Sequence, residues 1–166
     1  MDTNKISPVV LPSEPDKPDK NESGQDVSAN LSTSLTNKET SSLPKKDVLV
    51  LVVDDIVDNV VILSLDLQHE GYQVITASNG EEAVRVATLT KPNIILMDIG
   101  MPLLDGLGAT AKIRENDSLR NIPVVAVTAF STAGFRRAAY DVGFDGYITK
   151  PIDFQQLHEL ISRLLP

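Results

Sequence analysis

The sequence predicts an α/β domain in which helices cover both faces of a parallel β-sheet. Five short strand-like runs, most of them rich in Val, Ile or Leu, recur between residues 48 and 149, and a helical pattern follows each run. Unbroken apolar runs are typical of strands that are buried on both faces. Strands that alternate with helices pair in parallel through right-handed crossovers. Because barrel closure needs eight such units, we expect an open, doubly wound sandwich.

The first two strand–helix units are indicated by apolar runs and turn residues. A strand is predicted over residues 48–53, and the helix after it is predicted to end at Gly71, which suits a left-handed C-cap. The apolar positions of this helix are Val60, Val61, Leu63, Leu65 and Leu67. A second strand over residues 72–77 runs into the turn signal Ser78-Asn79-Gly80. Acidic residues 81 and 82 then favour a helix start, and Pro92 ends that helix.

The same alternation continues to the end of the chain. Strands are predicted over residues 93–98, 122–127 and 145–149. Helices are predicted from Gly106 to about residue 115, around residues 134–142, and over residues 154–165.

A change of composition near residue 46 divides the chain into two parts. Residues 1–46 contain five of the ten prolines, twelve Ser or Thr, and no aromatic residue. Such a segment cannot bury enough apolar surface to offset the entropy of ordering, so we expect a disordered arm. Residues 47–166 contain all seven aromatic residues, and we expect one compact domain there.

Charge and composition argue against several classes of function. The 23 acidic and 15 basic residues give a net charge of −8, which disfavours nucleic-acid binding. The absence of cysteine and the presence of only two histidines exclude disulfides and Cys- or His-rich metal sites. No apolar run approaches the ~20 residues that span a bilayer, and no secretory signal is present. We therefore expect a soluble, cytoplasmic protein without nucleic-acid or membrane partners.

Polar side chains stand at the carboxyl ends of the predicted strands, where open parallel sheets bind their ligands. Asp54 and Asp55 follow the first strand, and Asp98 ends the third. Thr128 follows the fourth strand, and Lys150 follows the fifth. Three carboxylates, one hydroxyl and one ammonium group are therefore expected at one edge of the sheet.

This combination of groups favours phosphoryl transfer. Three neighbouring carboxylates repel one another unless a cation lies between them, and all-oxygen ligands suit Mg²⁺. A cation, an ammonium group and a hydroxyl can stabilise a phosphoryl group that is transferred to an aspartate nucleophile. Each residue alone also has an ordinary explanation, as a helix cap or a surface lysine. Together they favour the functional interpretation.

Four motifs of the folded part resemble the receiver domain of two-component response regulators. They are Leu51-Val-Val-Asp-Asp55, Leu96-Met-Asp-Ile-Gly-Met-Pro-Leu-Leu-Asp-Gly106, Val127-Thr-Ala129 and Gly146-Tyr-Ile-Thr-Lys-Pro151. Each motif is weak alone, but their order and spacing are specific. The resemblance covers residues 47–166 and implies a flavodoxin-like sheet with strand order 2-1-3-4-5.

The resemblance also implies which residues accept the phosphoryl group and hold the metal. Asp98 is expected to be the phosphoacceptor. Asp54, Asp55 and Asp98 are expected to bind Mg²⁺ together with the backbone carbonyl of Gly100. Gly100 has no side chain that could shield the acceptor or position water beside it.

Three further roles follow from the same resemblance. Lys150 is expected to contact the phosphoryl group, and its bond to Pro151 is expected to be cis. Thr128 is expected to turn its hydroxyl toward a new phosphoryl group. Tyr147 is the aromatic residue expected to follow this switch.

The implied function is phosphorelay signalling rather than catalysis on another substrate. A sensor histidine kinase or a phosphotransfer protein would supply the phosphoryl group from a phosphohistidine. Because no output domain follows residue 166, we expect output by contact with a downstream protein, from a monomer or weak dimer. An aspartyl-phosphate phosphohydrolase is one alternative, although it needs a second acid where Gly100 stands. A receiver fragment of a hybrid histidine kinase is another.

The two histidines are not expected to take part in the relay. His69 lies at the end of a predicted helix, and His158 lies on the last amphipathic helix. We expect both side chains to be solvated.

Overall fold

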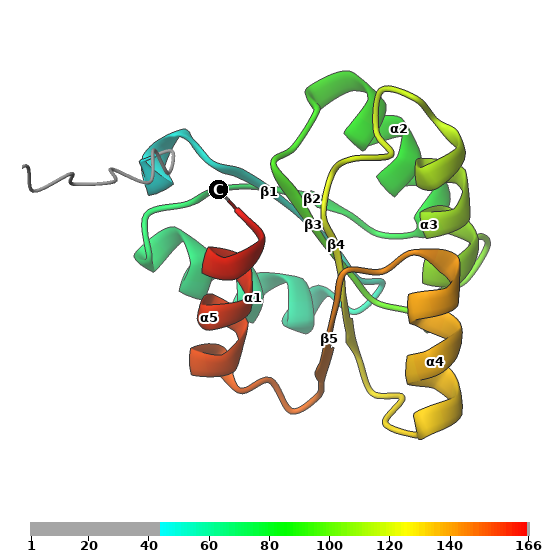
Figure 1. The fold of residues 1–166 in the computed structure, drawn as a ribbon. Coiled ribbons are helices and arrows are strands. Elements are labelled where there is room, and N and C mark those ends of the chain that lie inside the picture. Colours follow the sequence, from blue (N-terminus) through cyan, green and yellow to red (C-terminus); the bar gives the residue numbers. More distant parts are fainter. Residues whose placement is uncertain (1–43, 166) are drawn as a thin grey trace, which may run out of the picture. The chain divides into compact units, whose positions relative to one another are not determined.

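The computed structural model describes residues 44–165. Five parallel strands and five α-helices alternate along this part of the chain (Figure 1). Of the arm predicted over residues 1–46, residues 1–43 lie outside the described residues. Lys45–Asp47 form a short 3-10 helix, η1, directly before the first strand.

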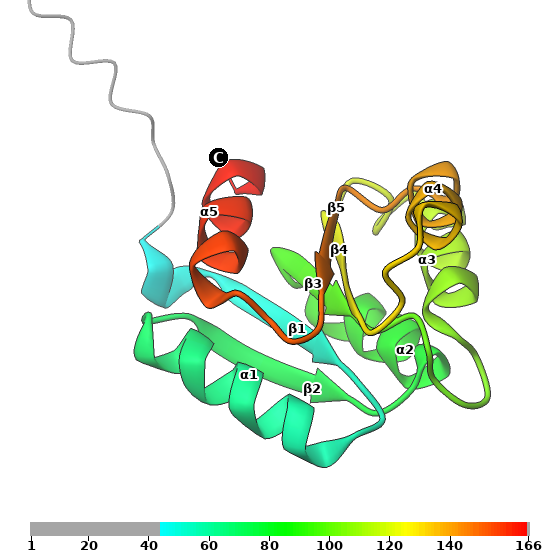
Figure 2. The ribbon, with the colours of Figure 1, turned by 90° about the horizontal axis from the view of Figure 1, so that it is seen from below.

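The strands form one parallel sheet. They are β1 (Leu49–Val53), β2 (Gln73–Ala77), β3 (Ile94–Met97), β4 (Val124–Thr128) and β5 (Gly146–Thr149). Their order is β2-β1-β3-β4-β5, which confirms the expected doubly wound topology (Figure 2). The order reverses between β1 and β3, and ligands bind beyond the strand ends at such a switch point. Asp54 follows β1 and Asp98 follows β3 at this position.

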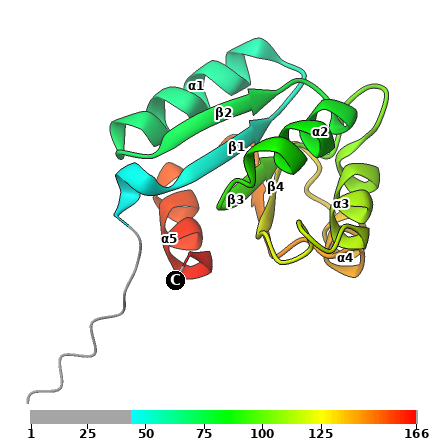
Figure 3. The same ribbon diagram turned by 90° about the horizontal axis from the view of Figure 1, so that it is seen from above.

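The helices cover both faces of the sheet. They are α1 (Val57–His69), α2 (Gly80–Thr90), α3 (Gly106–Glu115), α4 (Ala133–Val142) and α5 (Phe154–Leu164). Helices α1 and α5 lie on one face, and α2, α3 and α4 lie on the other (Figure 3). Within residues 44–165, no helix is long and apolar enough to cross a membrane.

Side-chain caps fix the starts of four helices. The side chains of Asn79, Asp105, Thr132 and Asp153 each accept a hydrogen bond from the backbone N–H three residues further on. These bonds satisfy N–H groups that have no partner inside the helix. The start of α1 differs, because its N-cap is Ile56 and no side chain caps it.

Each face of the sheet has its own apolar core because successive strand residues point to opposite sides. In β1, Val50 and Val52 pack under α1 and α5, whereas Leu51 and Val53 pack under the other three helices. All four side chains are at most 1% exposed. This two-sided burial explains why the strand has no polar alternation.

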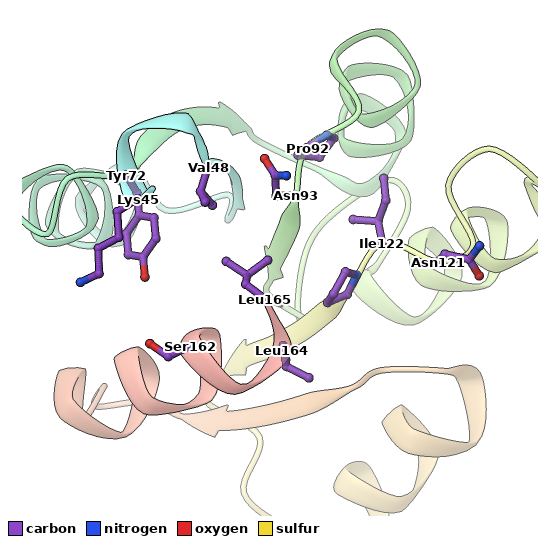
Figure 4. A pocket seen from close by; sticks show the side chains of 11 residues that line it. Lys45, Val48, Tyr72, Pro92, Asn93, Asn121, Ile122, Ser162, Leu164 and Leu165 are labelled. Atoms are coloured by element: carbon purple, nitrogen blue, oxygen red, sulfur yellow. The ribbon is translucent and has the colours of Figure 1, made fainter. Parts of the chain in front are cut away.

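A pocket of about 500 Å³ lies at the amino ends of β1, β3 and β4 (Figure 4). Residues from the segments just before these strands line it, among them Val48, Asn93 and Pro123, and Leu164 and Leu165 line it from the end of α5. The polar residues predicted to act together follow the carboxyl ends of the strands instead. This pocket is therefore separate from the candidate site.

Candidate functional site

The carboxyl ends of β1 and β3 bring three aspartates together. Asp54, Asp55 and Asp98 each offer a carboxylate oxygen, and these oxygens lie within 4.8 Å of one another. Asp54 and Asp98 are only 6% and 7% exposed, whereas Asp55 is exposed. The cluster therefore combines two buried carboxylates with one at the surface.

Lys150 connects two of these aspartates from the end of β5. Its Nζ lies 2.5 Å from Asp54 Oδ2 and 2.6 Å from Asp98 Oδ2. Burial lowers the pKa of Lys150, but the hydrogen bonds and charges of both carboxylates outweigh it, so the pKa lies above the ordinary 10.5. The ammonium group is therefore charged at neutral pH. The Lys150–Pro151 bond is cis, as the resemblance implies.

Asp54 is oriented by the beginning of α1. The Ile56 N–H donates to Asp54 Oδ1 over 2.9 Å, and Asn59 Nδ2 donates to both carboxylate oxygens over 3.1 Å. Asn59 was not among the residues predicted to form the site. The only sequence feature that could have indicated it is an amide side chain in the first turn of the helix after Asp54 and Asp55.

Asp98 is held by its own loop and by the start of α3. Its N–H donates to the Val53 carbonyl over 2.9 Å, and the Gly100 N–H donates to Asp98 Oδ1 over 3.1 Å. Gly106 lies against the Asp98 backbone, where a Cβ would overlap the Asp98 carbonyl oxygen. A glycine at this position lets α3 begin directly beside the aspartate.

Thr128 and Tyr147 meet at one residue, Phe130. The fully buried Thr128 accepts a hydrogen bond at Oγ1 from the Phe130 N–H, over 3.4 Å. The Tyr147 hydroxyl donates to the Phe130 carbonyl over 2.7 Å. Burial raises the pKa of Tyr147, which keeps its hydroxyl protonated as a donor. Phe130 was not among the predicted site residues, because no sequence pattern indicates such a role for an aromatic residue in a loop.

One expectation about the histidines is wrong. His69 is exposed, as expected, but His158 is only 24% exposed. Its Nε2 lies 2.6 Å from Asp66 Oδ2, and this pair connects α5 to α1. Within residues 44–165, no hydrogen bond joins either histidine to the aspartate cluster.

The aspartate cluster suits a divalent cation. When ionised, three carboxylates carry three negative charges, of which the Lys150 ammonium balances one. The remaining repulsion at 4.8 Å or less favours a bound cation. Only oxygen ligands are present in the cluster, and such a set suits Mg²⁺ better than a soft metal. That the backbone carbonyl of Gly100 is a further Mg²⁺ ligand remains a prediction.

Comparison with known proteins identifies the family. The family model of the response regulator receiver domain matches residues 50–162. The chain is 37% identical over 116 residues to the polar-differentiation response regulator DivK of Brucella anthropi. This alignment covers 70% of this chain and 94% of DivK. It is 41% identical over 115 residues to the response regulator PleD of Caulobacter vibrioides, across 69% of this chain but 25% of PleD. The chain therefore belongs to the response regulator receiver family.

Solved structures show the same architecture. The chemotaxis protein CheY4 of Vibrio cholerae aligns with a TM-score of 0.68 at 28% identity, over 71% of this chain and 98% of CheY4. The receiver domain of the sensor histidine kinase PA1611 of Pseudomonas aeruginosa aligns with a TM-score of 0.66 at 33% identity. That alignment covers 70% of this chain and 95% of the PA1611 domain, whose structure has a magnesium ion in the active-site cleft.

Family membership is consistent with phosphorelay signalling. Receiver domains are signalling modules that interact with histidine kinases or phosphotransfer proteins and with downstream targets. The phosphohydrolase alternative is not favoured.

Proposed function

We propose that Asp98 accepts a phosphoryl group from the phosphohistidine of a sensor kinase or phosphotransfer protein. The observation that carries this proposal is the position of Asp98 Oδ2, 2.6 Å from the Lys150 ammonium. Both oxygens of Asp54 already accept hydrogen bonds from Asn59, which suits a fixed ligand better than a nucleophile. Asp54 shares the burial and the contact with Lys150, so what distinguishes Asp98 is its place at the end of β3, the central strand of the sheet.

The transfer forms one bond and breaks another. An Asp98 carboxylate oxygen attacks phosphorus as the phosphorus–nitrogen bond of the donor histidine breaks, and the histidine nitrogen keeps the electron pair. Lys150 neutralises charge on the transferred phosphoryl oxygens. Because its pKa lies above 10.5, it can do so throughout the neutral range. Mg²⁺, held by Asp54, Asp55, Asp98 and the Gly100 carbonyl, would add positive charge at the same oxygens.

An exposed apolar surface beside the site supports a protein as the phosphoryl donor. Five large apolar residues of α1 and its N-cap are between 48% and 72% exposed. They are Ile56, Val57, Val61, Ile62 and Leu65. Contiguous exposed apolar side chains mark interaction sites, and these begin directly after Asp55.

The rest of the proposed organisation follows from charge and family. The family match over residues 50–162 supports a receiver domain over residues 47–166. The five prolines and the lack of aromatic residues in residues 1–46 support a separate arm before that domain. The net charge of −8 supports protein partners rather than nucleic acid. The proposed protein is cytoplasmic and is a monomer or weak dimer. It assists only its own phosphorylation and dephosphorylation.

Metal-dependent labelling of Asp98 tests this function. We expect acetyl phosphate to phosphorylate the full chain in Mg²⁺, because the cation offsets repulsion between the carboxylates and the phosphoryl oxygens. Intact mass and peptide mass spectrometry would measure the labelling and its position. Equal labelling in excess EDTA, or label on another residue, would contradict the assignment.

The variant Thr128→Ala should separate labelling from switching. Asp98, Lys150 and the metal ligands remain, so labelling with acetyl phosphate should persist. The variant loses one hydrogen bond to the charged phosphoryl group, worth roughly 1.5–3 kcal/mol, so the switched state should be less populated. NMR spectra with and without beryllofluoride would measure this, with shifts near Tyr147 expected only in the wild type. Equal shifts there in the variant would exclude Thr128 as the switch residue.

A further inference from the structure

Two consecutive arginines of α4 have different surroundings. Helix α4 packs beside the edge strand β5, and its Ala139 shares an apolar core with Tyr147 of that strand (Figure 1). Arg136 lies three residues before Ala139 and therefore on the same side of the helix. Arg137 lies on another side, where its Nε is 3.7 Å from Asp141 Oδ2.

The Arg136 guanidinium lies over the Tyr147 ring. Its Cζ is 5.0 Å from the ring centroid, within the range in which the face of an aromatic ring attracts a cation. Within residues 44–165, no carboxylate forms an ion pair with Arg136, although the chain has a net charge of −8. The aromatic ring is therefore the partner that the structure gives to this charge.

Two groups hold Tyr147 in a buried position. The residue is only 5% exposed, and its hydroxyl donates to the Phe130 carbonyl over 2.7 Å. This hydrogen bond fixes one end of the side chain, and the Arg136 charge lies over the face of the ring. The Phe130 N–H in turn donates to Thr128 Oγ1, so the buried ring is connected to the residue proposed as the switch.

We propose that Arg136 is a positioning residue of the switch, whose charge holds Tyr147 in this buried position. The inference rests on the proposed roles of Thr128 and Tyr147. A contact that is present in only one of two arrangements shifts the equilibrium toward that arrangement. The buried arrangement has both the hydrogen bond to Phe130 and the attraction to Arg136, whereas a ring turned out to solvent has neither. Arg136 therefore acts on the position of Tyr147 and not on the transfer of the phosphoryl group.

The side-chain rotamers of Tyr147 test this role. Three-bond couplings to Cγ, measured by NMR on the isotopically labelled full chain, give the populations of its staggered χ1 rotamers. In Arg136→Met, which keeps the aliphatic part of the side chain, the ratio of the main rotamer to the others should fall about fivefold, the change that ~1 kcal/mol gives. Arg136→Lys keeps a cation and should recover most of the wild-type ratio. The control Arg137→Met removes the neighbouring charge, whose side chain is 85% exposed, and should leave the ratio unchanged.

The outcomes distinguish this inference from the proposed function. Wild-type rotamer populations in Arg136→Met would overturn the role of Arg136 and leave the assignment of Asp98 as it is. An equal fall in Arg137→Met, or no recovery in Arg136→Lys, would also overturn it, because the effect would not depend on a cation over the ring. Label on a residue other than Asp98 in the wild type would overturn the proposed function instead, and the rotamer populations would still decide whether Arg136 holds Tyr147.

Discussion

Asp98→Asn is expected to abolish phosphorylation of the chain. An amide is a poor nucleophile, so it cannot take the phosphoryl group as a carboxylate does. The substitution hardly changes side-chain volume and leaves Asp54, Asp55 and Lys150 in place. Labelling with acetyl phosphate in Mg²⁺, followed by intact mass spectrometry, should fall to background.

Two further variants make this result specific. Asp117→Asn removes a carboxylate whose side chain is 93% exposed, and it should label as the wild type does. Asp55→Asn keeps the acceptor but removes a proposed metal ligand, so it should need more Mg²⁺ for the same labelling. Substantial labelling of Asp98→Asn would show that another residue accepts the phosphoryl group.

The fold could be predicted because its signals are local. Unbroken apolar runs mark strands buried on both faces, and the structure buries Val50, Leu51, Val52 and Val53 as that pattern predicts. Turn and capping residues such as Asn79 separate the strands from the helices. Parallel pairing then places the residues after each strand at a common edge, which is why Asp54 and Asp98 could be expected to meet.

The buried face of α1 could not be read from the sequence in the same way. Apolar residues recur at every second position of this segment, at Val61, Leu63, Leu65 and Leu67. A spacing of two residues places successive side chains on different sides of a helix. The structure buries Leu63 and Leu67 and leaves Val61 and Leu65 exposed. The spacing of four residues between the buried pair matches one helix face.

Contacts between distant parts of the chain account for what sequence reasoning missed in and around the site. His158 and Asp66 are 92 residues apart, and only the packing of α5 beside α1 brings them together. The contact of Phe130 with Gly100 likewise depends on how two loops lie over neighbouring strands. Local patterns give the chemical character of a position, but packing decides what that side chain touches.

Lys150→Met is expected to make folding stability strongly dependent on Mg²⁺. The variant keeps most of the aliphatic side chain but removes the charge that lies between buried Asp54 and Asp98. Removing one partner of a buried ion pair leaves an uncompensated charge, at a cost of about 3 kcal/mol without metal. A cation that binds only the folded state would recover part of this loss. Thermal unfolding in EDTA and in Mg²⁺ measures both effects.

The comparison needs a matched control and a suitable pH. Lys112→Met removes an exposed lysine from α3 and should leave the effect of Mg²⁺ on the unfolding temperature at its wild-type size. The raised pKa of Lys150 means that its stabilisation is complete below pH 10.5 and is lost only as the pH rises through the folded-state value. Wild type and Lys150→Met should therefore differ throughout the neutral range. An equal response to Mg²⁺ in Lys150→Met and in wild type would show that Lys150 does not balance the charge of the aspartate cluster.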